Sequence, residues 1–282
     1  MSAVVLTSAL PPRRRSWTLL VGLVLVSVVV ATALVSLVWL PFDPSDTSGT
    51  RLEGPNATHW LGTDKLGRDL ATQLMIGARI ALTVGLGSVA VGAVIGISVG
   101  LVAAFAASWL DDTISAALDV VIAFPVLLLA MLIVAAQGAS LGSVILAIGL
   151  AMSAIVARLT RVLTKRVLGE QFVTAARTSG TRWPGIVARH ILPNIWPTLS
   201  VNLALQFGVA VLAEASLSYL GLGAPPPNAS WGRLLQEAQG TVITAPVGAI
   251  APGIALIMLV IGVNFVADGL RDVADPSRRR SR

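Results

Sequence analysis

The sequence predicts an all-α integral membrane protein with six transmembrane helices and both termini in the cytoplasm. Apolar residues make up 55% of the 282 residues and charged residues only 12%, whereas soluble domains carry about 25% charged residues. Several apolar blocks reach the roughly 20 residues that a helix needs to cross a bilayer. No separate soluble domain fits between these blocks. The placement of the basic residues then decides the orientation.

With the N-terminus inside, 15 of the 20 Lys and Arg residues fall in cytoplasmic segments and five in outer segments. This is the positive-inside bias of membrane proteins, and it accounts for the net charge of +6 without a nucleic-acid partner. The absence of cysteine excludes disulfides, thiolate metal sites and cysteine nucleophiles. The two histidines, His59 and His190, fall on opposite sides of the membrane in this topology, so we expect no metal site.

A cytoplasmic arm, residues 1–16, precedes the first predicted span at residues 17–40. A secretory signal peptide is the alternative, but this apolar run exceeds the roughly 7–15 residues of a signal core and no small-residue cleavage site follows it. Residues 41–78 are polar and turn-rich and form the predicted extracytoplasmic loop. Its run GTDKLGRD matches neither a phosphate-binding loop nor an EF-hand. We therefore expect a folded loop that docks against another protein.

The second span is predicted at residues 79–107 and contains a stripe of glycines. Gly92, Gly96 and Gly100 recur at every fourth position. Small residues let helix backbones approach closely in lipid. We therefore expect this helix to pack tightly against another helix rather than face lipid all round.

Four further spans complete a core of residues 79–272, which a basic tail at 273–282 follows. A tight turn is predicted at Trp109–Asp112, and Pro125 lies at the middle of the third span. The predicted bounds of the four spans are 114–136, 141–162, 195–220 and 247–267.

Two acidic residues stand within the predicted spans, where a charge is costly and usually faces a cavity or a partner. Asp119 lies near the basic residues that end the fourth span, so we expect it to form an ion pair with Arg158 or Arg161. Glu214 lies about two helical turns from the outer end of the fifth span. It either lines the outer vestibule or hydrogen bonds a neighbouring helix. Two isolated acids do not make a proton relay.

Aromatic and proline residues mark the predicted outer surface. Trp60 and Trp231 are interpreted as interfacial anchors, with substrate stacking as the alternative. Pro225–Pro227 is predicted to stiffen the last outer loop. The following residues, 231–239, then form a short helix that gates the vestibule or contacts a binding protein.

The segment from Glu170 to Asn194 is polar, basic and too amphipathic to cross a bilayer. Residues 170–179 are predicted to form a short helix, which Gly180 ends in the left-handed conformation. The residues near one face of this helix are Phe172, Ala175, Ala176 and Ser179. The paired alanines make that face flat.

A second short helix is predicted to follow. Thr181 is expected to cap it, Pro184 to lie in its first turn and Pro193 to end it. The residues it would present are Trp183, Ile186, Val187, His190 and Ile191. A helix–glycine–helix element of this kind suits recognition in the groove of another protein. The alternative is an amphipathic connector that rests on the anionic leaflet.

The run from Ala175-Ala176 to Gly180, followed by His190-Ile-Leu-Pro193, resembles the EAA loop of ABC importer permeases. More narrowly, HILPN resembles the second permease subunit of the dipeptide, oligopeptide and nickel importer family. Segments similar to family segments, in the same order, are residues 51–70, 77–85, 124–130, 214–235 and 268–276. In that family the loop is the coupling helix that sits in a cleft of the ATPase subunit. One departure is Thr174, which replaces the acidic first residue of the family's EAA triplet. A contact made by that acid is therefore in doubt, although a hydrogen bond from Thr174 remains open.

The resemblance implies a type I ABC importer permease fold and a non-catalytic, multi-pass subunit of the bacterial cell membrane. The implied ATPase-coupling residues are Thr174, Ala175, Ala176, Gly180, Trp183, Ile186, His190 and Pro193. The residues assigned to the translocation path or gate are Asp119, Glu214 and Trp231. The implied partners are a homologous second permease, ABC ATPase subunits that contact residues 170–192, an extracytoplasmic solute-binding protein and membrane lipid.

The chain itself is expected to bind no cofactor. It contains no GxxxxGK[ST] motif, so ATP and Mg²⁺ are assigned to the partner ATPase. The expected cargo is a di- or oligopeptide, with nickel, haem or another small solute as the alternative. A secondary transporter would show inverted repeats and several buried ionisable groups, and a membrane enzyme would need a clustered catalytic set such as HExxH or GxSxG. The sequence shows neither pattern.

Overall fold

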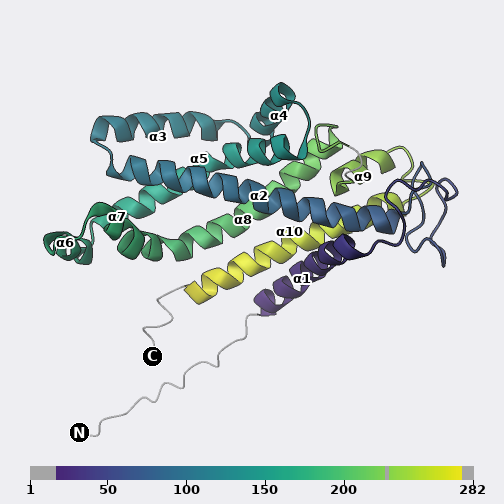
Figure 1. Cartoon of the computed structure of the whole chain (residues 1–282), viewed down its shortest axis with the longest axis horizontal. Helices are drawn as coiled ribbons and strands as arrows, with labels where there is room; N and C mark the ends of the chain where they lie inside the picture. The colour runs from purple at the N-terminus through teal and green to yellow at the C-terminus, as the bar shows by residue number, and fades with distance from the viewer. Residues whose placement is uncertain (1–16, 226–228, 275–282) are drawn as a thin grey trace, which may run out of the picture.

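The computed structural model describes residues 17–225 and 229–274, and Figure 1 shows them as a bundle of long helices. The expected cytoplasmic arm at 1–16, most of the expected basic tail and two of the three prolines of Pro225–Pro227 lie outside the described residues. Within the described part of the chain, every named element is a helix. The prediction of an all-α membrane protein is confirmed.

Five helices are long and apolar enough to cross a membrane, and a sixth span results if one bent helix pair is counted as a single span. The five long helices are α1 (Trp17–Val38), α2 (Leu70–Phe105), α5 (Leu141–Leu168), α8 (Leu192–Tyr219) and α10 (Val247–Ala274). The bent pair is α3 (Ser108–Ala123) and α4 (Val126–Gln137). The shorter elements are α6 (Gln171–Thr178), α7 (Trp183–Ile186), the π-helical turn η1 (Val187–Ile191) and α9 (Trp231–Ala238).

Helix α2 begins nine residues before the predicted start of the second span at Arg79. Asp69 is the reason, because its side chain caps the helix and accepts a hydrogen bond of 2.7 Å from the backbone N–H of Thr72. An aspartate at this position satisfies one of the free N–H groups of the first turn. At 1.5 Å per residue the 36 residues of α2 span about 54 Å, well beyond the roughly 30 Å of the hydrocarbon core.

The third predicted span, residues 114–136, corresponds to the bent pair, because α3 and α4 meet at an angle of 89°. The break falls at Phe124 and Pro125. Proline lacks the N–H that would continue the helix, and its ring disfavours helical geometry in the preceding residue. The turn predicted at Trp109–Asp112 is also displaced, because those residues lie inside α3 and the chain turns at Ala106 and Ala107.

The glycine stripe of α2 packs against α5, as predicted. A Cβ atom added at Gly96 would lie 2.6 Å from the carbonyl oxygen of Ser153, and one at Gly100 would lie 2.5 Å from that of Ala157. Real Cβ atoms do not approach backbone oxygens so closely. The two helix backbones are therefore in direct contact, which only glycine allows at these positions.

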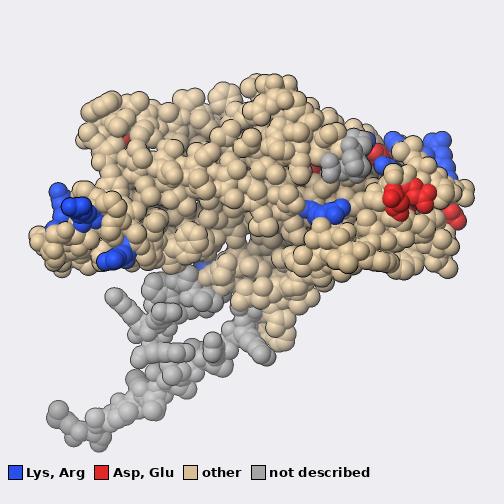
Figure 2. Space-filling view, viewed as in Figure 1, with Lys and Arg blue, Asp and Glu red and all other residues tan. Residues whose placement is uncertain are grey.

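The helices place two groups of polar elements at opposite ends of the bundle (Figure 1). The start of α1, the end of α10 and the α6–α7 elements point to one end, while residues 41–69 and α9 lie at the other. Figure 2 shows Lys and Arg without Asp or Glu on the visible surface around α6 and α7, and a mixture of both charges at the opposite end. This distribution follows the basic bias found in the sequence.

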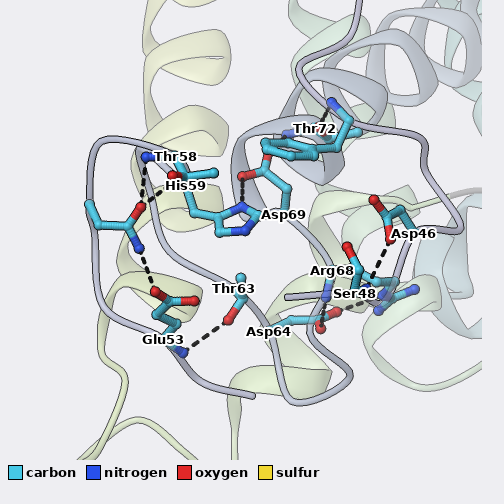
Figure 3. Close-up of polar contacts among 12 residues, drawn as sticks. Asp46, Ser48, Glu53, Thr58, His59, Thr63, Asp64, Arg68, Asp69 and Thr72 are labelled. Atoms are coloured by element: carbon cyan, nitrogen blue, oxygen red, sulfur yellow. Dashed lines mark hydrogen bonds and ion pairs between the residues drawn. The ribbon is translucent and has the colours of Figure 1, made fainter. Parts of the chain in front are cut away.

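Residues 41–69 form a folded loop held by a polar network (Figure 3). His59 Nδ1 lies 3.0 Å from an oxygen of Asp69, the residue that caps α2. Arg68 contacts Asp64 at 2.6 Å and reaches Glu237 of α9 at 2.7 Å. These contacts tie the loop to the start of α2 and to the end of α9, so the expected folded loop is present.

Candidate functional site

The α6–α7 segment, defined as residues 170–192, connects α5 to α8 at the basic end of the bundle (Figure 1). Three arginines of this segment are exposed, namely Arg177, Arg182 and Arg189. Helix α6 contains no acidic residue, and its exposed N-cap, Glu170, is the one acidic residue of the segment. The segment therefore offers a positive surface suited to an acidic protein surface or to lipid headgroups.

Gly180 separates the two short helices in the left-handed conformation, with φ of +84°. Its N–H donates to the carbonyl of Arg177, and the N–H of Thr181 donates to the carbonyl of Ala176. This pair of bonds is the Schellman motif that ends many helices at a glycine. The predicted left-handed termination is confirmed. No atom lies within 4 Å of a Cβ built at Gly180, so a side chain would meet no steric clash there. The left-handed backbone conformation is what favours glycine at this position.

One face of α6 is attached to the bundle and the other is free in this chain. Val173 is buried together with Ile186, Ile191 and Val156 in a cluster beneath the segment. Phe172, Thr174 and Ala175 are exposed, and Ala176 is half-buried. The small side chains that the sequence assigned to a docking face therefore lie largely at the surface.

The structure differs from the predicted second helix of this segment in three respects. Ile186 and Ile191 are fully buried, so they hold the segment to the bundle and are not presented to a partner as expected. Arg182, and not Thr181, occupies the N-cap position of α7, without a side-chain hydrogen bond. Pro193 does not end the helix, because η1 leads directly into α8.

The π-helical turn explains how the chain stays helical at Pro193. The N–H of Leu192 donates to the carbonyl of Val187, five residues earlier. A proline cannot donate to the carbonyl four residues before it and clashes with that carbonyl in a regular helix. The wider turn removes the conflict. The side chain of Asn194 donates to the carbonyl of His190 at 2.6 Å and so supports the same turn.

Trp183 is the centre of an aromatic contact that sequence reasoning missed. Its ring packs edge-on against Phe105, the last residue of α2, with 5.0 Å between the ring centroids. The guanidinium of Arg177 lies 4.8 Å from the centre of the same ring. Trp183 is still 41% exposed and lines an open hollow with Pro184 and Val187. The contact joins α6 and α7 to the end of α2, which lies far from both of them in the sequence.

Ion pairs join α3 to α5 near the same end of the bundle. Asp111 is buried and accepts hydrogen bonds from Arg161 at 2.5 and 2.7 Å and also contacts Lys165. Asp119 pairs with Arg158 at a more exposed position. The predicted pairing of Asp119 with one of the two arginines is therefore confirmed. The role of Asp119 in the translocation path stays a prediction.

Glu214 is buried within the bundle and hydrogen bonds two serine hydroxyls. Ser218, one turn later on α8, donates to its carboxyl group at 2.6 Å, and Ser230, the N-cap of α9, is the second partner. The sequence predicts that Glu214 either lines the outer vestibule or hydrogen bonds a neighbouring helix. In the described residues it forms hydrogen bonds within the protein. Glu214 thereby connects α8 to the start of α9.

Trp231 lies in the core of the bundle. It is 2% exposed, and its indole N–H donates to the carbonyl of Leu74 at 3.0 Å. A Cβ atom added at Gly77 would lie 2.3 Å from the indole ring, so this glycine makes room for it. The interpretation of Trp231 as an interfacial anchor is wrong, because α9 turns the side chain inward onto α2. Trp60, by contrast, is 61% exposed.

Comparison with known proteins gives a consistent result. Residues 92–280 match the model of a family described as binding-protein-dependent transport system inner membrane component. The chain is 36% identical over 92% of its length to the dipeptide transport system permease protein DppC of Alkalihalophilus pseudofirmus, covering 86% of that protein. It is 40% identical over 79% of its length to the glutathione transport system permease protein GsiD of Pectobacterium atrosepticum, covering 74% of that protein.

A similar fold occurs in a solved structure described as inward facing conformations of the MetNI methionine ABC transporter. The TM-score is 0.61, and the match covers 72% of this chain and 96% of that chain. At 21% sequence identity this likeness shows the fold alone. Taken with the family match over residues 92–280, it leads to one conclusion. The chain belongs to the family of binding-protein-dependent transport system inner membrane components, the multi-pass permease subunits of bacterial ABC importers.

Proposed function

We propose that this permease forms half of a translocation pathway for short peptides and that its α6–α7 segment receives the movement of partner ATPase subunits. A second, homologous permease would supply the other half, and an extracytoplasmic binding protein would deliver the peptide. ATP and Mg²⁺ would be bound by the ATPases. The peptide assignment rests on the names of the relatives, which include dipeptide and glutathione transport permeases.

The observation that carries the coupling role is the construction of the α6–α7 segment. It projects at the basic end of the bundle with a small, exposed face at Thr174 and Ala175. It is also rigidly attached, because Val173, Ile186 and Ile191 are buried below it. A projecting helix pair with a buried base transmits displacement to the helices that carry it, here α5 and α8.

Gly180 provides the experiment that tests this role. Gly180→Val forces a β-branched residue into the left-handed region, which disfavours such residues strongly. We expect the Schellman turn to reopen and peptide uptake to fall about tenfold or more, while the protein remains in the membrane. Uptake of a labelled dipeptide and the ATPase rate of the purified assembly are the measurements.

Gly180→Asn is the matched control, because asparagine tolerates the left-handed conformation and no atom lies within 4 Å of the new Cβ. We expect this variant to keep most of the uptake. If Gly180→Val also retains normal uptake and normal association with the ATPases, the coupling assignment is wrong, whatever the transported solute.

A further inference from the structure

A second feature of the bundle is an open groove of about 590 Å³ between α1, α2 and α8, with Val263 of α10 also in its lining. Its walls are apolar and include Leu34 and Leu37 of α1, Leu86 of α2 and Phe207 of α8. Leu34, Leu37 and Leu86 are each more than half exposed. None of the residues that line the groove belongs to the α6–α7 segment.

Arg79 of α2 is the only charged residue among those that line the groove. Within the described residues, no Asp or Glu lies at ion-pair distance from its guanidinium. A cation kept beside an apolar groove without an internal partner therefore points to an anionic partner from outside this chain.

The position of Arg79 along α2 places it at the membrane interface. From Ile80 to Phe105 the helix contains no charged residue. The 26 uncharged residues from Ile80 to Phe105 span about 39 Å on their own, more than the roughly 30 Å of the hydrocarbon core, so Arg79 and the turns before it need not enter the hydrocarbon. Residues 41–69 and α9 lie at this same end of the bundle (Figure 1). Arg79 thus stands where phosphate headgroups lie.

The length of the groove matches one leaflet. Along α1 its lining runs from Leu37 to Val26, and along α2 from Arg79 to Val89. At 1.5 Å per residue these distances are about 16 and 15 Å, and half of the hydrocarbon core is about 15 Å. Leu37 lies in the last turn of α1, and Arg79 lies near the start of α2, so both mark the interface end.

We propose that this groove binds one anionic glycerophospholipid, with its phosphodiester on Arg79 and an acyl chain along α1 and α8. A guanidinium pairs with phosphate oxygens through two parallel hydrogen bonds. The acyl chain fills apolar surface that the bundle leaves open and makes van der Waals contacts along it. The bound lipid would thereby fasten α1 to the core of the permease.

Native mass spectrometry of the intact transporter assembly tests the site. The assembly is equilibrated with mixed micelles of phosphatidylglycerol and phosphatidylcholine, and the retained lipids are counted. We expect one phosphatidylglycerol per copy of this chain to be retained preferentially. Arg79→Gln should weaken that retention about tenfold or more, as expected for a lost charge-assisted hydrogen bond. Arg51→Gln, which removes an exposed arginine of the outer loop, should leave it unchanged.

Filling the groove tests the acyl-chain half of the proposal. Ala204→Phe adds a ring to the groove lining and should reduce the retention of both lipids. Val94→Phe adds the same ring to α2 at an exposed position outside the lining and should have no effect. Inorganic phosphate at equal concentration should not displace the lipid, because it lacks the acyl chain. Displacement by phosphate, or a lipid preference that survives Arg79→Gln, would overturn the proposal.

A photo-crosslinking amino acid at Thr83, an exposed residue of the groove, identifies the occupant directly. A lipid adduct supports the proposal. An adduct to the second permease would show that a protein helix fills the groove, and would overturn it. Neither result depends on the transported solute or on the coupling role of the α6–α7 segment.

Discussion

At the residue scale, two neighbouring positions of α6 have similar exposure, and we expect them to have different roles. Thr174 and Ala175 are both exposed in this chain. Thr174 replaces the acid found in the family pattern, whereas Ala175 belongs to the small face expected to meet the ATPase. Val173, between them and the bundle, is buried. Placing the same acidic residue at Thr174 and at Ala175 in turn therefore separates the effect of the added charge from the effect of its position on α6.

We predict that Ala175→Glu reduces dipeptide uptake about tenfold or more and that Thr174→Glu retains it. A carboxylate at Ala175 would be desolvated without a partner in the docking cleft, which costs several kcal/mol. The same carboxylate at Thr174 restores the residue type of the family pattern. Uptake in membrane vesicles, with equal amounts of permease, measures both. An equal loss in the two variants would argue against a position-specific docking face.

Other residues show that the same side chain has a different structural role in different surroundings. Trp231 and Trp60 carry the same indole, yet one is buried on Gly77 and the other is exposed. Asp111 and Asp119 both pair with basic residues of α5, but the side chain of Asp111 is 7% exposed and that of Asp119 is 58% exposed. Pairs of exposed charges contribute little to stability. We therefore assign the fastening of α3 to α5 chiefly to Asp111.

At the scale of elements, the close approach of α2 and α5 depends on residues without side chains. Gly92, Gly96 and Gly100 were identified from spacing, and each faces α5. Gly149 of α5 likewise lies against α2, because a Cβ added there would lie 2.7 Å from the side chain of Val91. The helix pair therefore forms a rigid unit, and α5 carries the α6–α7 segment at its far end.

We predict that Gly96→Ala lowers the thermal stability of the purified permease. The new Cβ would lie 2.6 Å from both the Ser153 carbonyl and Val156, and overpacking of this kind costs about 1–3 kcal/mol. Gly253→Ala in α10 is the control, since no atom lies within 4 Å of its Cβ position. There the higher helix propensity of alanine should stabilise by up to about 1 kcal/mol. Equal melting temperatures for the two variants would contradict the direct backbone contact.

At the scale of the whole molecule, an even number of spans places the start of α1 and the end of α10 on one side. The bent pair α3–α4 must then count as one crossing. The basic bias predicts that this side, with the α6–α7 segment, is the cytoplasm. The loop at residues 41–69 would lie outside, where a binding protein can reach it.

We predict that single cysteines at the two ends of the bundle are labelled from opposite sides of the membrane. The chain contains no cysteine of its own, so Ser48→Cys in the outer loop and Ser179→Cys after α6 are unique sites at exposed positions. A membrane-impermeant maleimide should label Ser48→Cys in intact spheroplasts and Ser179→Cys only after lysis. Labelling of both in intact spheroplasts would refute the proposed orientation.

The sequence by itself determined the class of protein and the order of its spans, because apolar length, glycine spacing and charge bias depend on the bilayer and on neighbouring residues. It also located the left-handed turn at Gly180 and the pairing of Asp119, which depend on short-range geometry. The resemblance of residues 175–193 to the EAA loop of ABC importer permeases indicated the family. These features need no knowledge of distant contacts.

Only the tertiary structure decided which faces the elements present. Ile186 and Trp231 look like surface residues in amphipathic segments, but packing against other helices buries both. The contact of Phe105 with Trp183 depends in the same way on where the helices meet. The groove beside Arg79 is lined by residues of four helices, α1, α2, α8 and α10. The physical reason is that burial is a property of a side chain's neighbours in space, and those neighbours come from remote parts of the chain.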